Sequence, residues 1–150
     1  MHHPSDLTRA LAQRVLAASR SAADPPGSDV VVASERLRVS LTRFAGAEGF
    51  ESLRRRSWAL ASAEVPALLV MRVEKGGRLE GWEQLAAHFR ADAGTPDAEH
   101  AASEAAVTIT AHLLELMVTF IGRSLTLRLL DEAWPDTLPF SSQSTTEAEQ

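Results

Sequence analysis

The stretch from Glu99 to Trp134 is strongly apolar and carries a single line of polar residues. At about 100° per residue, this line occupies an arc of roughly 100° on one helix. Its members are Glu104, Thr108, His112, Glu115, Thr119, Arg123 and Thr126. Apolar side chains cover the rest of the circumference, and apolar surface left in water forfeits about 25 cal/mol per Å². The pattern therefore predicts a long buried helix, from about Ala98 to Trp134, covered by the rest of the chain or by a second copy.

Two helices are predicted in the N-terminal third. Ser5 is a suitable N-cap for the first, which ends before the DPPG sequence at residues 24–27 because proline cannot continue a helix. The second is predicted from apolar residues that share one face: Val30, Ala33, Leu37, Leu41 and Phe44. Residues 37–42 also alternate with period two and contain β-branched side chains, so a strand is the alternative there.

Two further helices are predicted in the middle of the chain. The third follows a turn bracketed by Gly46 and Gly49, ends at Pro66, and has an inward face of Phe50, Leu53, Leu60 and Ala61. The fourth is predicted from helical spacing of Trp82, Leu85, Ala86 and Phe89. Between them, an apolar run and a Lys-Gly-Gly turn predict a short β-hairpin near residues 67–80. Residues 93–97 are expected to form the loop before the fifth helix.

These elements predict a mainly α fold, a five-helix bundle around a long C-terminal helix. Residues 1–140 would form a single helical domain, with Leu138 and Phe140 docking on it, and residues 141–150 a disordered polar tail. A straight final helix of about 35 residues would reach roughly 50 Å, longer than a compact domain of this size. Self-association would cover the excess, and Gly122 offers a place to bend. We therefore predict a homodimer whose interface includes Leu114, Met117, Val118, Ile121 and Leu125.

Composition narrows the setting of this fold. The chain has 150 residues, 45% hydrophobic content and no cysteine, which excludes disulfides, thiolate metal sites and thiol nucleophiles. No secretory pattern is found near the N-terminus, so the cytoplasm is the expected location. His112, Glu115 and Arg123 interrupt the apolar run, which argues against membrane insertion.

His112 and Glu115 lie one helical turn apart and face the same way. With Thr119 and Arg123 they are candidates for a polar network, in which His112 would respond to pH, provided that another surface covers them. A metal site would need further donors, and no other helix offers an obvious pair. The interpretation preferred from sequence is a narrow, at least partly exposed stripe, with neither metal nor cofactor.

A cluster of arginines supplies the candidate anion or nucleic-acid contact. Arg54, Arg55 and Arg56 follow a glycine turn, and the spacing of Ala45 and Gly49 resembles the helix-turn-helix of DNA-binding proteins. The resemblance covers only about residues 41–60, and it departs from the motif where Arg55 takes a position expected to be apolar. A net charge of −5 with one lysine also disfavours nucleic acid as a partner.

No catalytic, nucleotide-binding or metal motif stands out, so an enzyme is not predicted. The expected function is a non-catalytic, cytoplasmic interaction or regulatory protein that binds itself and another protein. The alternatives are a DNA-binding regulator that uses the three arginines, and a binder of an apolar small molecule in a cavity lined by aromatic residues. The identity of the partner and the biological process are not encoded in any recognisable motif.

Overall fold

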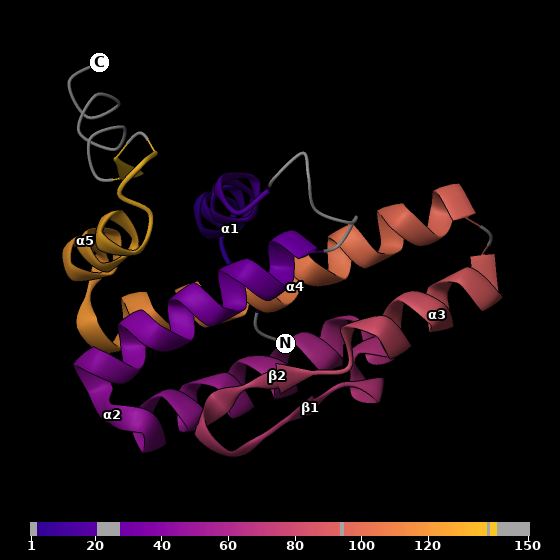
Figure 1. Cartoon of the computed structure of the whole chain (residues 1–150), viewed down its shortest axis with the longest axis horizontal. Helices are drawn as coiled ribbons and strands as arrows, with labels where there is room; N and C mark the ends of the chain where they lie inside the picture. Colours follow the sequence, from indigo (N-terminus) through magenta and orange to yellow (C-terminus); the bar gives the residue numbers. More distant parts are fainter. Residues whose placement is uncertain (1–2, 21–27, 94, 138, 141–150) are drawn as a thin grey trace.

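The computed structural model describes residues 3–20, 28–93, 95–137 and 139–140. Within them the fold consists of five helices and one small antiparallel sheet, which confirms the mainly α prediction (Figure 1). The DPPG turn, Leu138 and the tail at 141–150 lie outside the described residues. Phe140 is buried against the body, as predicted, where its ring meets Trp134 edge to face.

Helices α1 (Asp6–Ala18) and α2 (Ser28–Glu64) begin the fold. Ser5 caps α1 as expected, because its Oγ accepts a hydrogen bond of 3.1 Å from the backbone N–H of Thr8. The strand alternative for residues 37–42 is wrong, since these residues are helical in α2. The second and third predicted helices are two arms of α2, joined at Gly46, where φ is 83° and ψ is 162°.

Phe44 does not follow the buried face predicted for the first arm. Val30, Ala33, Leu37 and Leu41 are buried, whereas Phe44 is 49% exposed. The arm ends two residues later at Gly46, and Phe44 lines a groove between α2 and the last helix. Its ring is therefore available at the surface.

A 3₁₀ segment and a hairpin connect α2 to the next helix. Residues Pro66–Val70 form the 3₁₀ turns, and β1 (Arg72–Val73) pairs with β2 (Leu79–Glu80) around the glycine turn. The predicted hairpin is thus confirmed, although its strands are shorter than the apolar run suggested. Helix α3 (Trp82–Ala93) follows, and α4 (Thr95–Ile121) begins two residues after it ends. The predicted loop at 93–97 is too long because Pro96 is accommodated in the first turn of α4.

The prediction of a single long C-terminal helix up to Trp134 is wrong. Helix α4 ends at Ile121 and α5 (Arg123–Ala133) starts after Gly122, which has φ 89° and ψ 159°. Only glycine adopts this region readily. The chain turns there and α5 packs against α2 and α4, so the final segment folds back instead of projecting from the domain (Figure 1).

Helix α4 is the centre of the molecule and contacts all four other helices. Every residue from Ala105 to Leu114 is buried. One part of the core joins α4 to α1, α5 and the first arm of α2, and a second part joins it to α3, the hairpin and the second arm. Residues 97–121 have the length and composition of a membrane span, but 67% of the most apolar window is buried inside the protein. The expectation of a buried core helix is therefore confirmed.

Gly122 offers a direct test of the break between α4 and α5. Replacing it with alanine places a side chain at φ 89° and should lower the free energy of unfolding by about 1–3 kcal/mol. No atom lies within 4 Å of the added Cβ, so backbone strain is the only expected cause. Ser124→Ala, at an exposed position in α5, is the matched control. Urea unfolding curves that are the same for both variants would contradict the proposed strain.

Candidate functional site

The best-defined polar cluster of the structure surrounds His112, on the buried side of α4. The His112 side chain is completely buried, and its Nε2 is hydrogen-bonded to one carboxylate oxygen of Glu64, the last residue of α2. The other oxygen of Glu64 lies 2.8 Å from Nδ1 of His3, just before α1. One carboxylate thus joins two imidazoles and ties the N-terminal segment and the end of α2 to the core helix.

The environment of Glu64 favours its charged form. Burial raises the pKa of the carboxyl group, but the hydrogen bonds and charges of His3 and His112 outweigh burial, so that the pKa is lowered from its ordinary value. The geometry of this cluster can hold a charge and fix three segments.

The polar stripe predicted on the last helix is partly exposed: Thr108, His112 and Thr126 are buried, whereas Thr119 and Arg123 are exposed. Thr108 is 4% exposed and donates to the backbone carbonyl of Glu104, while Arg9 of α1 forms an ion pair with the Glu104 side chain. The covering surface is the chain's own α1 and α2. Sequence periodicity identified the line of polar residues but did not identify Glu64, which is 48 residues away from its partner His112.

The four residues predicted to form one polar network differ in their surroundings. Glu115 has one buried carboxylate oxygen without a hydrogen-bond partner among the described residues. Thr119 is exposed and donates to the carbonyl of Glu115. Arg123 belongs to α5, beyond the break at Gly122, where the helical phase starts again. Only His112 has the paired, buried environment that the hypothesis required.

The predicted interface residues fall into two groups. Leu114 and Met117 are buried in the core of the single chain, at 0% and 1% exposure, and so contribute no surface themselves. Val118, Ile121 and Leu125 are half-buried around the end of α4 and the start of α5. The homodimer stays a prediction, and any such contact would have to use this second group.

The three arginines point in different directions. Arg54 is buried, Arg55 pairs with Glu51 on the surface at 3.0 Å, and Arg56 is exposed. The buried position of the series is therefore Arg54, whereas the comparison with helix-turn-helix proteins placed it at Arg55. Burial lowers the pKa of Arg54 to about 10, which leaves the guanidinium charged at neutral pH. A continuous basic surface made by all three side chains is not present.

Two of the cavities on the described surface adjoin the first arm of α2. A groove of about 540 Å³ runs between the first arm of α2 and α5, and its walls include Val39, Phe44 and Leu129. A cleft of about 480 Å³ lies between that arm and the hairpin and is lined only by charged side chains. Neither is a closed cavity lined by aromatic residues, which the apolar-ligand hypothesis requires. No group of three His, Asp or Glu residues suited to a metal is found within the described ranges.

Comparison with known proteins gives no family: no family model, no curated protein and no solved structure matches the chain.

The Glu64 cluster predicts a specific pH dependence of stability. Because the folded-state pKa of Glu64 is lowered, its contribution is complete above the ordinary value of 4.5 and is lost as the pH falls through the lowered value. Glu64→Gln should cost about 1.5–3 kcal/mol at neutral pH, the usual range for hydrogen bonds to charged groups. The difference from wild type should shrink as the pH falls below 4.5 and the wild-type carboxyl becomes protonated at its lowered pKa.

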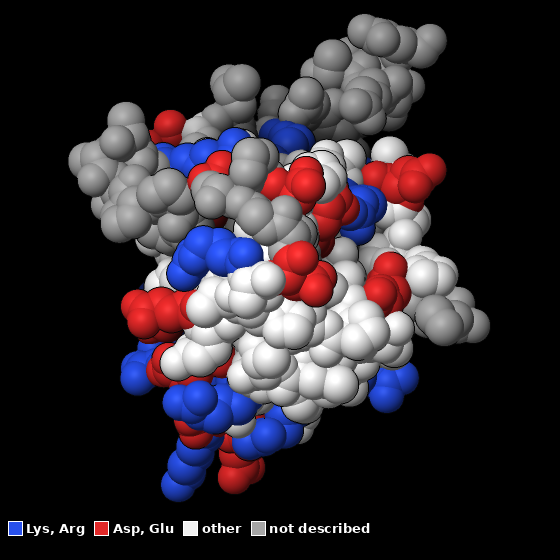
Figure 2. All heavy atoms as spheres, turned by 90° about the vertical axis from the view of Figure 1, so that its right-hand side faces the viewer, with Lys and Arg blue, Asp and Glu red and all other residues white. Residues whose placement is uncertain are grey.

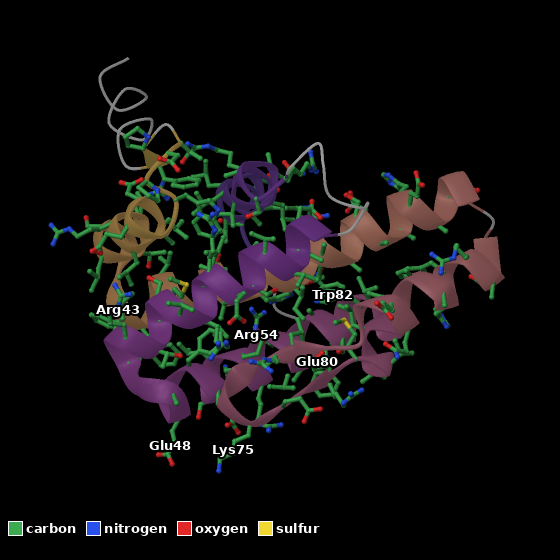
Figure 3. All side chains as sticks on the ribbon, in the orientation of Figure 1. Arg43, Glu48, Arg54, Lys75, Glu80 and Trp82 are labelled. Carbon is green, nitrogen blue, oxygen red and sulfur yellow. The ribbon has the colours of Figure 1, made fainter. Side chains whose placement is uncertain are left out.

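Urea unfolding at a series of pH values would measure this difference. Glu48→Gln is the matched control, since Glu48 is an exposed glutamate at the corner of α2 (Figure 3). A loss of stability in Glu64→Gln that is independent of pH would contradict the assignment.

Proposed function

We propose that the protein is a non-catalytic, cytoplasmic interaction protein that self-associates and presents its helical surface to a further protein. The observation that carries this proposal is Phe120. It lies in the last full turn of the central helix, and 65% of its surface is exposed. A large aromatic side chain that extends a buried core helix into solvent is typical of a contact surface, because aromatic residues are enriched at the centres of protein interfaces.

Further apolar side chains belong to the same end of the molecule. This end is formed by the corner of α2, the end of α4 and the start of α5 (Figure 1). Val39 and Phe44 are 46% and 49% exposed and line the α2–α5 groove. Val118, Ile121 and Leu125 are half-buried beside the break at Gly122. Covering such surface stabilises a complex by about 25 cal/mol per Å² before the costs of association.

Charges around the groove fit a second copy of the same chain. The groove is bordered by two basic residues, Arg36 and Arg43, and by two acidic residues, Glu35 and Glu132. In a two-fold symmetric contact, the same patch from each subunit meets the other, so a surface with both signs can be complementary to itself. This balance supports self-association better than binding to a strongly charged polymer.

The DNA-binding alternative has less support. It was founded on three neighbouring arginines, but Arg54 is buried and Arg55 is engaged with Glu51. Phosphate contacts supply most of the affinity for nucleic acid, and a net charge of −5 opposes them. We therefore retain the protein-interaction hypothesis.

The opposite end of the molecule provides a control surface. It shows a broad area of uncharged residues in Figure 2. Leu69, in the connection between α2 and β1, is 62% exposed, nearly the same as Phe120. A carboxylate can therefore be introduced at Phe120 or at Leu69, two positions of nearly equal exposure at opposite ends of the molecule.

Self-association predicts that Phe120→Asp dissociates the dimer, whereas Leu69→Asp leaves it intact. The buried interface would have to accept an unpaired carboxylate, which weakens association by about a hundredfold or more. Size-exclusion chromatography with light scattering at micromolar concentrations measures the molar mass of each variant. A wild-type monomer, or dissociation by Leu69→Asp in place of Phe120→Asp, would refute this proposal.

A further inference from the structure

Arg54 carries a charge that the fold buries and does not neutralise. Its side chain is 1% exposed, and its Nε has no hydrogen-bond partner among the described residues. Burial lowers its pKa, and Arg54 forms no ion pair with a carboxylate of the described residues. The guanidinium carbon instead lies 5.6 Å from the centroid of the Phe50 ring. Buried charges in proteins are normally paired, because removal from water is costly.

Three other buried donors on α2 and α3 also lack hydrogen-bond partners among the described residues. They are Oγ1 of Thr42, on the first arm of α2, Oγ of Ser62, on its second arm, and Nε1 of Trp82, at the start of α3. In Figure 3 the Arg54 side chain extends from the second arm towards the first, and Trp82 is labelled beside the same region. With Arg54, these four donors without partners are unusual in an interior where more than about 90% of polar groups are hydrogen-bonded.

The charged cleft lies between the first arm of α2 and the hairpin, whose turn is close to the Phe50 ring. Its lining comprises Arg38, Arg72, Glu74, Lys75, Arg78 and Glu80. The turn of the hairpin packs tightly on Phe50, since a Cβ added at Gly77 would lie 2.4 Å from the ring. Phe50 therefore touches the hairpin turn and lies beside the Arg54 guanidinium. The Arg54 guanidinium is thus linked through the Phe50 side chain to the turn that carries Lys75 and Arg78.

The cations of the cleft are only partly neutralised. Arg38 pairs with Glu35, and Arg72 pairs with Glu74 at 2.6 Å. Among the described residues, Lys75 and Arg78 form no ion pair and interact at longer range with Glu51 and Glu35 respectively, each of which already pairs with another arginine. Glu80 is the remaining acidic group of the lining. Together with Arg54, these unpaired groups carry a net positive charge.

We propose that this cleft binds a small anion with two or more negative charges, of the phosphate or polycarboxylate class. Lys75 and Arg78 hold it at the mouth, and Arg54 attracts it from behind through the low dielectric of the interior. The ligand supplies the negative charge that Arg54 lacks. The site is separate from the apolar surface around Phe120, so that the oligomeric state and the binding of an anion can be tested independently.

Thermal unfolding in inorganic phosphate and in citrate tests this inference, each at constant ionic strength against chloride. A ligand that binds only the folded state raises the melting temperature, and the anion that gives the larger rise identifies the class. The site variants are Arg54→Met and the surface double variant Lys75→Gln with Arg78→Gln, which leaves the core unchanged. Arg56→Gln, an exposed arginine of the same helix, is the matched control.

We expect wild type and Arg56→Gln to gain several degrees, as is usual for about 100-fold saturation of a site in a domain of this size. Both site variants should lose most of this gain. Without added anion, Arg54→Met should melt at the same temperature as wild type or higher, because a well-packed apolar side chain replaces an unpaired charge. Phosphate and citrate also stabilise proteins non-specifically. An equal gain in all variants, or no gain in wild type with either anion, would overturn the proposal.

Discussion

The structure depends on one constraint, which is the burial of α4 on all of its sides. Ten consecutive residues, from Ala105 to Leu114, have no exposed face. A helix in this position needs neighbours around its whole circumference, and α1, α2, α3 and α5 supply them. The same constraint extends to the polar residues of α4. Thr108 and His112 cannot reach water and are instead hydrogen-bonded, to the carbonyl of Glu104 and to the carboxylate of Glu64.

Two glycines allow a short chain to surround its own core helix. At Gly46 and Gly122 the backbone adopts positive φ with ψ near 160°, which a residue with a Cβ rarely accepts. Each break folds one arm of a long helical segment back along the molecule. The first encloses the hairpin side of the core, and the second returns α5 to α2. Because α5 folds back, the chain covers most of the apolar surface for which the sequence argument invoked a second copy, and Phe120 remains outside.

The sequence predicted the elements better than their contacts. Helical periodicity located the inward face of α3 and, apart from Phe44, that of the first arm of α2, and the Lys-Gly-Gly turn located the hairpin. Periodicity relates residues within one helix, so it could not show that Glu64 pairs with His112, or that Gly122 ends α4 instead of bending it. At Gly46 the helical phase starts again, which is why Arg54 turned inward and Arg55 outward, the reverse of the expectation.

The two buried basic side chains show how the candidate sites differ in kind. His112 forms an ion pair inside the protein with the carboxylate of Glu64. Arg54 meets an aromatic ring, and a pKa of about 10 leaves it cationic at neutral pH. An imidazole can also shed its proton when buried, whereas a guanidinium cannot do so under ordinary conditions. Stability alone would therefore favour an apolar residue at position 54. The unpaired cation of Arg54, near a cleft of net positive charge, is the feature that supports the proposed anion site.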